Sequence, residues 1–324
     1  MSAKTESVEV EETGVQARKP RALRSGGAWL PIAPASPADF AKVVAGAEEL
    51  RRLGFRVEDA TPLSSEGYFA GSVRGRREEL RQGLERKDVD GLVAVRGGYG
   101  ANYLLDELAL PATAAPKVIF GYSDLTSLQI FLWQKYGWVG FYGPMLGAGL
   151  AAGAGAANGY DKESLLAAIG TTAGGWRISL KGEALTQGEA EGRVLGGCLT
   201  LVETTLGTPW ELDTRGAVLL LEDRGMKPWQ VDRALMHLKQ AGKFEGVPGI
   251  LLGDFPECDA PMSGSPTVRE VCARILGGLG IPVVFGAPMG HTQRPMLTVP
   301  LGVRAHLAAR GEGSLEIMEP AVTE

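Results

Sequence analysis

The chain has 324 residues, which exceeds the size of one comfortable hydrophobic core and favours two domains. Hydrophobic residues make up 44% of the chain and charged residues 22%, which is the balance of an ordinary globular protein. The formal net charge of -5 excludes the basic surface with which proteins bind nucleic acids or anionic membranes.

No apolar run is long enough for a transmembrane helix, and residues 1–18 lack the hydrophobic core of a signal peptide. We therefore expect a cytoplasmic protein with neither a membrane nor a nucleic-acid partner. Its three cysteines, Cys198, Cys258 and Cys272, fall into no metal or redox spacing. We expect them to be packing residues in a reducing compartment.

The first half of the chain alternates predicted strands and helices. Residues 1–19 are polar and acid-rich, and we expect them to be disordered. A strand is predicted within residues 28–35, followed by a helix with Ser36 as its N-cap and Pro37 at its first position. Further strands are predicted at residues 55–57 and 91–95, and helices at residues 74–84 and 102–108. This alternation predicts a parallel, doubly wound sheet, whose ligands bind beyond the carboxyl ends of the strands.

Two turns follow successive predicted strands and should open side by side at that edge of the sheet. The first is the RGGYG turn, Arg96 to Gly100. Gly97 and Gly98 remove side chains there, so backbone N–H groups could approach a reacting carbonyl and form an oxyanion site. Alternatively, the glycines only serve a tight turn with positive φ. The spacing does not match the G-x-G-x-x-G fingerprint of dinucleotide-binding proteins.

The second turn lies within residues 117–136, KVIFGYSDLTSLQIFLWQKY. The strand-like run Val118 to Phe120 changes to a helical period at Leu125, which lifts Ser123 off the sheet edge. A nucleophile elbow has this geometry, and the N–H of Asp124 could donate to an oxyanion. The alternative is a simple helix N-cap, and the stretch lacks the second glycine of the usual G-x-S-x-G pattern.

The second half of the chain begins after a run of small residues at 147–159, which indicates a domain boundary or a linker. The predicted divisions are a tail at 1–19, an N-terminal domain at 20–150, a linker region at 151–185 and a C-terminal domain at 186–324. Strands are predicted at residues 188–195, 217–221, 249–253 and 281–285, and a helix at residues 231–241.

An acidic residue, Glu222, ends the apolar strand 217–221. A buried carboxylate needs a partner, because an isolated one is costly. The sequence leaves open whether Glu222 has a catalytic role, pairs with Arg224 or Arg233, or faces solvent.

His291 lies in a glycine- and proline-bounded loop, residues 286–292, that follows a predicted strand. Loops of this kind position catalytic groups on rigid scaffolds. The two other histidines have structural contexts, since His237 falls inside a helix and His306 in a late polar strand. His291 alone has the context of a general base.

Ser123, Glu222 and His291 thus occur in the order nucleophile, acid and base, each after a predicted strand. A serine hydroxyl becomes a good nucleophile when an imidazole takes its proton, and a carboxylate fixes the tautomer of that imidazole and stabilises its cation. The spacing does not prove that the three side chains meet.

Five motifs carry a family resemblance: RGGYG, GYSDLTSL, GGCLTLVETTLGTPW, LLLEDRGMKPWQVDRAL and GHTQRPMLTVPLG. Together, over about residues 20–307, they resemble the LD-carboxypeptidase family of serine peptidases. The resemblance implies an α/β fold, with a flavodoxin-like, parallel-sheet N-terminal domain joined to a smaller β-rich α/β C-terminal domain.

The resemblance also implies an enzyme that removes the terminal D-alanine from murein tetrapeptides during cytoplasmic recycling of cell-wall fragments. The catalytic residues of the family fall on Ser123, Glu222 and His291, and its oxyanion donors on the backbone N–H groups of Asp124 and Gly98. No cofactor is implied, neither a metal nor an organic group. One departure is Cys198, which stands where the family usually has asparagine in G-G-N-L.

The implied partner is a small peptide, the muropeptide stem, whose carboxylates should attract basic side chains. Basic residues close to the motifs are Arg96, Arg224, Lys227, Arg233 and Arg294. As candidate substrate contacts we single out Arg96, Tyr99 and Arg233. The sequence leaves the oligomeric state open, a homodimer included.

The sequence leaves two alternative functions open. A relative in the same superfamily hydrolyses aminoacyl-adenylate peptide antibiotics and confers self-immunity, and it would share the triad. Stacking on adenine would need an aromatic-rich insertion, whereas the region between the predicted domains offers only Trp176. The other alternative is a non-catalytic protein whose two lobes close on a peptide, for which replacement of Ser123 would change nothing.

Overall fold

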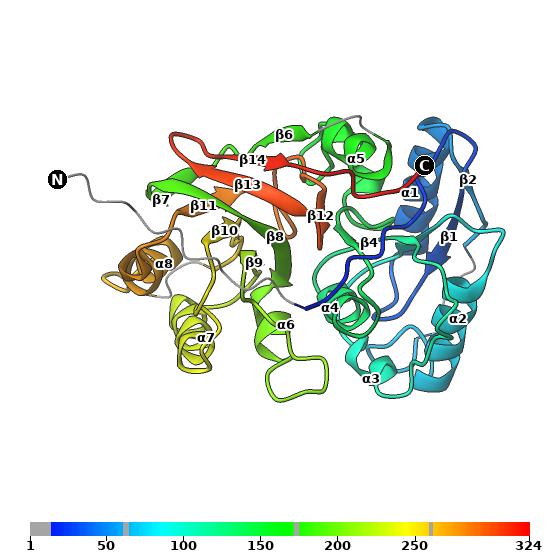
Figure 1. The fold of residues 1–324 in the computed structure, drawn as a ribbon. Helices are drawn as coiled ribbons and strands as arrows, with labels where there is room; N and C mark the ends of the chain where they lie inside the picture. The colour runs from blue at the N-terminus through cyan, green and yellow to red at the C-terminus, as the bar shows by residue number, and fades with distance from the viewer. Residues whose placement is uncertain (1–13, 61–64, 172–174, 259–261) are drawn as a thin grey trace.

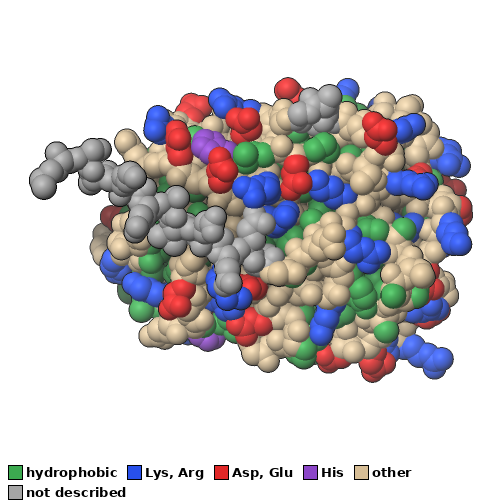
Figure 2. All heavy atoms as spheres, in the orientation of Figure 1, with side chains coloured by type: hydrophobic (Ala, Val, Ile, Leu, Met, Phe, Trp, Pro, Cys, Tyr) green, Lys and Arg blue, Asp and Glu red, His purple; other side chains and the backbone are tan. Residues whose placement is uncertain are grey.

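The computed structural model describes residues 14–60, 65–171, 175–258 and 262–324. Figure 1 shows two sheets lying side by side, each with helices packed against it. On the face seen in Figure 2, basic and acidic side chains are interspersed. Among the described residues, no helix is both long and apolar enough to cross a membrane.

The first sheet has six strands. In spatial order they are β12 (Val299–Leu301), β5 (Gly140–Tyr142), β4 (Val118–Gly121), β3 (Gly91–Ala94), β1 (Ala28–Ile32) and β2 (Arg56–Val57). All neighbours pair in parallel except β12, which runs antiparallel to β5. The order 2-1-3-4-5 of its first five strands is the flavodoxin-like order. The predicted fold class is therefore confirmed for this part of the chain.

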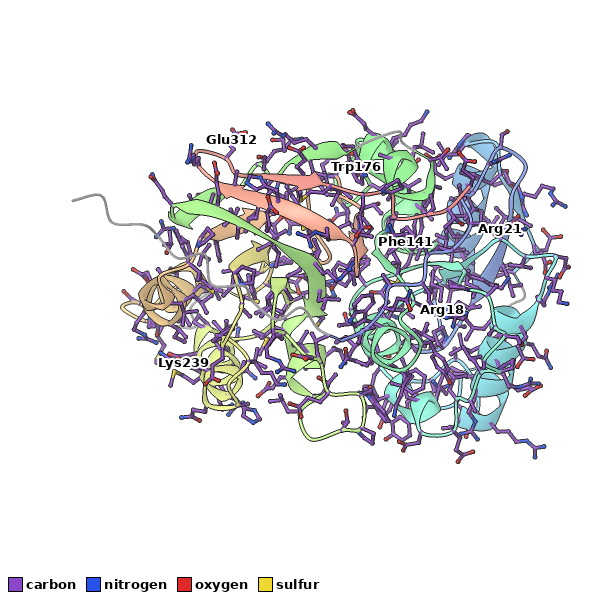
Figure 3. The ribbon with its side chains drawn as sticks, in the orientation of Figure 1. Arg18, Arg21, Phe141, Trp176, Lys239 and Glu312 are labelled. Carbon is purple, nitrogen blue, oxygen red and sulfur yellow. The ribbon has the colours of Figure 1, made fainter. Side chains whose placement is uncertain are left out.

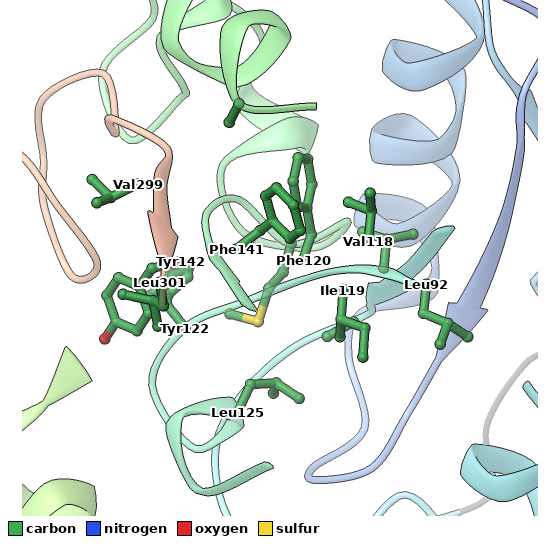
Figure 4. Packing of buried hydrophobic residues seen from close by; sticks show 14 of the residues in the cluster. Leu92, Val118, Ile119, Phe120, Tyr122, Leu125, Phe141, Tyr142, Val299 and Leu301 are labelled. Carbon is green, nitrogen blue, oxygen red and sulfur yellow. The ribbon is translucent and has the colours of Figure 1, made fainter. Parts of the chain in front are cut away.

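Helices cover both faces of the first sheet. They are α1 (Phe40–Arg52), α2 (Val73–Glu85), α3 (Asn102–Leu105) and α4 (Leu125–Tyr136), followed by the short η1 (Leu150–Ala152). The connection through α1 runs outward from β1 to β2, whereas those through α2, α3 and α4 run in the opposite direction across the sheet. Because parallel crossovers are right-handed, α1 lies on one face and the other three helices on the opposite face. Figure 4 shows Ile119 of β4 on the same side of the sheet as Leu125 of α4, with Phe120 and Phe141 pointing to the opposite side.

The second sheet has eight strands and confirms a β-rich second half. Their order is β6 (Trp176–Ser179), β14 (Ser314–Ile317), β13 (Arg304–Ala309), β8 (Gly188–Cys198), β9 (Ala217–Glu222), β10 (Gly249–Gly253), β11 (Val283–Ala287) and β7 (Glu183–Thr186). The four strands from β8 to β11 are parallel, and antiparallel strands flank them on both sides.

Strand β9 is buried on both sides, as its unbroken apolar sequence predicts. Leu219 and Leu221 belong to a core formed with α7 (Pro228–Gln240) and α8 (Val268–Leu276), which lie together on one side of the sheet (Figure 1). The alternate residues Val218 and Leu220 belong to the larger core that continues into the first sheet. The remaining short helices are α5 (Lys162–Ile169), α6 (Leu199–Glu203) and η2 (Gly277–Leu279).

The predicted start of the first helix is wrong. Helix α1 begins at Phe40, and the N-cap is Asp39, whose side chain accepts a hydrogen bond from the N–H of Ala41 at 2.9 Å. Ser36 instead binds the RGGYG turn, because its hydroxyl accepts from the N–H of Tyr99 at 3.1 Å. A contact with a turn that lies 63 residues further along the chain leaves no trace in local sequence pattern.

Several long-range contacts and elements cross the predicted domain boundaries. Residues 1–13 of the predicted tail lie outside the described residues, but Arg18 donates its backbone N–H to Gly137 at 2.6 Å, and Figure 3 places its side chain beside α4. The predicted linker, residues 151–185, includes α5 and β6. From the predicted C-terminal domain, β12 joins the first sheet, where Val299 and Leu301 lie beside Tyr142 (Figure 4). The exact domain boundaries stay a prediction.

Candidate active site

Ser123 stands in a strained turn between β4 and α4. Its φ is +62°, the left-handed region that a residue with a Cβ enters only at a cost of about 1–2 kcal/mol. Asp124 occupies the N-cap position of α4, and its side chain makes no cap hydrogen bond. The local geometry therefore favours the elbow over the simple N-cap, and the strain is carried by the residue whose hydroxyl is lifted from the sheet.

The RGGYG turn is fastened to this elbow. The Asp124 carboxylate is buried and accepts a hydrogen bond from the N–H of Ala101 at 2.7 Å and another from Gly100. Burial raises the pKa of Asp124 to about 6, although these hydrogen bonds and the nearby Arg76 guanidinium work in the opposite direction. A Cβ on Gly97 would lie only 2.9 Å from the Cβ of Ser123. Glycine at this position is what lets the two turns touch.

Glu222, the last residue of β9, is fully buried and holds His291. The carboxylate oxygen Oε2 lies 2.9 Å from Nδ1 of His291 and accepts the backbone N–H of the same residue at 2.8 Å. A Cβ on Gly290 would lie 2.4 Å from Cδ of Glu222, so the loop comes this close only because residue 290 is glycine. The partner of Glu222 is thus His291, and the interpretations that paired it with Arg224 or Arg233, or exposed it to solvent, are wrong.

Two opposing effects act on the His291 imidazole. Burial favours its neutral form, while the Glu222 carboxylate favours the cation and prevails, so that the pKa of His291 is raised above its ordinary value. The ring also makes an edge-on contact with Tyr122, with 5.1 Å between ring centroids. Tyr122 immediately precedes Ser123, so this contact brings His291 to the elbow. Within the described part of the chain no hydrogen bond joins Ser123 to His291, and such bonds often tighten only when substrate binds.

A chain of buried hydrogen bonds supports Glu222 from behind. The Tyr142 hydroxyl donates to Oε1 of Glu222 at 2.5 Å and has the Thr126 hydroxyl as a further hydrogen-bond partner. Thr126 in turn accepts the backbone N–H of Cys198 at 3.1 Å. Thr126 and Tyr142 come from α4 and β5, whereas Cys198 and Glu222 end β8 and β9. This chain, which we call the Tyr142 relay, therefore links the two sheets directly behind the site.

Cys198, the departure from the family pattern, contributes its backbone N–H to this relay. Its Sγ is buried 3.5 Å from Oδ2 of Asp223, and burial raises the pKa of the thiol well above its usual value. A buried neutral thiol is a packing residue rather than a nucleophile, as the sequence predicts.

A cavity of about 400 Å³ opens beside His291 and Tyr122. Its wall includes two cations, Lys42 of α1 and Arg224, together with Glu257. Arg224 is paired with Glu257 at 2.5 Å, whereas Lys42 has no ion-pair partner among the described residues. Lys42 was not anticipated, because a lysine on an amphipathic helix carries no motif signal.

The three predicted substrate contacts lie outside the wall of this cavity and stay predictions. Arg96 is exposed, and its guanidinium donates to the carbonyl of Pro37 at 3.3 Å. Tyr99 belongs to a cluster of exposed aromatic rings. Arg233 lies on α7 with its guanidinium over the ring of Trp229, 5.1 Å from the centroid.

Comparisons with known proteins agree with this architecture. Residues 31–143 match the model of the LD-carboxypeptidase N-terminal domain, and residues 191–307 match that of the LD-carboxypeptidase C-terminal domain. The probable murein peptide carboxypeptidase of Bacillus subtilis (strain 168) is 33% identical over 310 residues, which cover 94% of this chain and 96% of that protein.

Solved structures show the same fold. The microcin C7 self-immunity protein MccF in complex with aspartyl sulfamoyl adenosine has a TM-score of 0.84 at 26% identity, covering 94% of this chain and 99% of that one. The muramoyltetrapeptide carboxypeptidase from Oxalobacter formigenes has a TM-score of 0.80 at 26% identity, covering 91% and 100%. The fold and these matches define a peptidase, a hydrolase of the carboxypeptidase class. The chain belongs to the LD-carboxypeptidase family.

Proposed function

We propose that the protein is a serine carboxypeptidase that removes the terminal D-alanine from murein tetrapeptides during cytoplasmic cell-wall recycling. One observation carries the proposal: His291, paired with the buried Glu222, is packed against the turn that holds a strained Ser123. The relatives named as murein peptide and muramoyltetrapeptide carboxypeptidases supply the substrate class.

In this mechanism the Ser123 hydroxyl attacks the carbonyl carbon that joins an L-configured centre to D-alanine. Nε2 of His291 takes the hydroxyl proton and then gives it to the departing D-alanine amine, while Glu222 holds Nδ1–H and stabilises the imidazolium. Backbone N–H groups of Asp124 and Gly98 hold the oxyanion. Water, activated by the same imidazole, then cleaves the acyl-enzyme and restores the serine. These steps need no metal and no organic cofactor.

The cavity next to His291 suits the small leaving group. Lys42 supplies a cation for the terminal carboxylate of the peptide, and Arg224 adds a second donor beside its Glu257 partner. A terminal carboxylate requirement is what makes a peptidase a carboxypeptidase. Lys42→Ala should therefore raise KM for the tetrapeptide, with kcat changed much less.

Hydrolysis of an aminoacyl-adenylate antibiotic is the second candidate, because the self-immunity protein shares the fold at a TM-score of 0.84. The one aromatic residue that the sequence offered for stacking on adenine, Trp176, lies in β6 at the edge of the second sheet (Figure 3). Its side chain is half-buried against the main core and does not line the cavity. This position favours the murein peptide as substrate.

Product analysis separates the candidates. Purified protein is incubated in parallel with a murein tetrapeptide, the same peptide ending in L-alanine, and an aminoacyl-adenylate antibiotic, and the products are identified by mass spectrometry. We expect loss of one alanine from the D-alanine peptide alone. Cleavage of the antibiotic alone would assign the protein to the self-immunity function, and binding without turnover of any compound would leave a two-lobed binding protein.

A further inference from the structure

An exposed aromatic cluster stands at the edge of the first sheet, beside the RGGYG turn. Tyr68, Tyr99 and Tyr103 are 64%, 45% and 50% exposed, and they surround Phe69. The ring centroids of Tyr68 and Tyr103 lie 5.8 and 5.9 Å from that of Tyr99, and Phe69 stacks on Tyr99 at 6.0 Å. We call these four residues the aromatic platform. Contiguous exposed apolar surface of this kind marks a binding site more often than chance.

A buried arginine beneath the Phe69 ring supports the platform. Arg76 is buried, lies 4.7 Å from the centroid of the Phe69 ring and donates to the carbonyls of Gly100 and Gly71 at 2.9 and 3.2 Å. The same guanidinium also donates to the carbonyl of Pro34. One buried cation thus ties three backbone segments together. Rings that are already fixed lose little conformational freedom when a ligand binds.

The platform occupies the place where this fold binds ligands. In the order 2-1-3-4-5 the topological switch point lies between β1 and β3, and ligands bind beyond the carboxyl ends of the strands there. Tyr99 belongs to the turn that follows β3, and its N–H donates to Ser36, in the segment that follows β1. The chain next to Phe69 is also bound to the segment that follows β1, because the N–H of Ala70 donates to the carbonyl of Ala35 at 2.9 Å.

The span from Ser123 to the platform matches the length of the proposed substrate. From β4, which precedes Ser123, to β1 is two strand spacings, or about 10 Å at roughly 4.8 Å each. Three extended residues cover about 10 Å. A tetrapeptide cleaved before its last residue has three residues on that side of the bond. The group attached to the N-terminus of the stem therefore arrives at the part of the platform beside the segment that follows β1, where Ala70, next to Phe69, is bonded to Ala35.

We propose that the aromatic platform is a subsite for the saccharide ring that the murein stem peptide carries on its N-terminus. A sugar presents an apolar C–H face and a rim of hydroxyls, and tyrosine rings offer both an apolar face and polar tips. The hydroxyls of Tyr99 and Tyr103 are already hydrogen-bond partners. The inference rests on the proposed function, and it makes sugar-linked peptides better substrates than free ones.

The test compares a free tetrapeptide with the same peptide linked to N-acetylmuramic acid. The proteins are the wild type and the double variants Tyr68→Ala/Tyr103→Ala and Tyr68→Phe/Tyr103→Phe, which leave the RGGYG turn intact. We expect wild-type kcat/KM to be on the order of tenfold higher for the sugar-linked peptide, the ~1.4 kcal/mol typical of aromatic contacts. The alanine variant should lose this preference while cleaving the free peptide at the wild-type rate, and the phenylalanine variant should keep most of it.

Three outcomes would overturn the proposal. Equal wild-type kcat/KM for the two peptides would show that there is no saccharide subsite, while the carboxypeptidase function would stand. A parallel loss on both peptides in the alanine variant would make the platform a structural support for the RGGYG turn. An unchanged preference together with a change from dimer to monomer in light scattering would assign the platform to a contact with a second copy of the chain. Failure of the wild type on both peptides would instead contradict the proposed function itself.

Discussion

In the proposed mechanism, the single residue that sets the pH dependence is His291. The Glu222 carboxylate raises the pKa of the imidazole above its ordinary value of about 6.5. A general base must be neutral, so kcat/KM should rise with pH and reach half its maximum above pH 6.5. Protonated His291 stabilises the folded protein below the unfolded-state pKa, and that contribution is lost as pH rises through the folded-state pKa. The enzyme form with neutral His291 is therefore active, and it lacks the stabilisation that protonated His291 provides.

Replacement of the carboxylate tests this account. In Glu222→Gln the charge that favours the cation is gone while burial remains, so the midpoint of the pH–rate profile should fall. The rate at the optimum should fall on the order of 10³- to 10⁴-fold, because the amide no longer fixes the tautomer. A variant whose pH profile matches that of the wild type would show that Glu222 does not act on His291.

Tyr142 is expected to position Glu222 without touching substrate. Tyr142→Phe removes the 2.5 Å hydrogen bond to Oε1 and leaves the carboxylate charge more available to the imidazole. The midpoint of the pH–rate profile should therefore move upward, and kcat should fall by about tenfold at an almost unchanged KM, the effect of one hydrogen bond.

A matched control exists elsewhere in the molecule. Tyr160 is also buried and donates at 2.7 Å to Glu49, a residue outside the proposed triad. Tyr160→Phe should lower the melting temperature to a similar extent without moving the pH midpoint. If both variants shift the profile equally, the effect is general loosening rather than positioning of Glu222.

At this scale the sequence predicted the residues with motif signals and missed those without. Ser123, Glu222 and His291 follow apolar runs that end abruptly, and the structure brings Glu222 and His291 into contact. Tyr142 and Lys42 were missed, since an isolated tyrosine in an apolar run and a lysine on a helix are also what a core strand and a solvent-facing helix contain.

At the scale of the elements, the contact between the RGGYG turn and the serine elbow leaves the least space for a side chain. A Cβ on Gly97 would lie 2.9 Å from the Cβ of Ser123, closer than two such atoms can approach, and 3.1 Å from its Oγ. Gly97→Ala should therefore push the turns apart and lower kcat at least 100-fold, since small displacements of a nucleophile are costly. Steady-state kinetics on a tetrapeptide measures this loss.

The control is Gly278→Ala, in η2, where an added Cβ would meet nothing within 4 Å. It should retain wild-type kinetics. Wild-type activity in Gly97→Ala would show that the two turns separate freely, and that no oxyanion donor depends on their contact.

Elements with a strong local period were predictable, and short paired elements were not. Strand β10 and helix α4 coincide with their predicted positions, because apolar runs and helical spacing determine them. Strands β5 and β12 have three residues each, and β12 enters the first sheet only by pairing with β5, more than 150 positions earlier in the chain. The cap of α1 was misplaced for the same reason, since Ser36 is used by a distant turn.

In the whole molecule, a strand pairing and backbone hydrogen bonds connect the two halves of the chain. Strand β12 completes the first sheet, and the backbone of Thr323 donates to Pro20 and accepts from Ala22, both at 2.8 Å. Ala321 and Val322 are buried in the main core. Neither sheet keeps its full core when the chain is cut at a predicted domain boundary.

We therefore expect cooperative unfolding. Calorimetry of the full chain should give one transition in which the two sheets melt together. Two resolved transitions, or a stably folded fragment 1–150, would show instead that the halves are independent domains.

The central claim is that Ser123 is the nucleophile of a carboxypeptidase. The most direct measurement is the rate of D-alanine release from a murein tetrapeptide by the wild type and by Ser123→Ala, side by side, with the fold of each checked by circular dichroism. We predict that the wild type releases one D-alanine per peptide and that the variant is slower by about 10⁴-fold or more. A folded variant that keeps activity within tenfold of the wild type would contradict the claim.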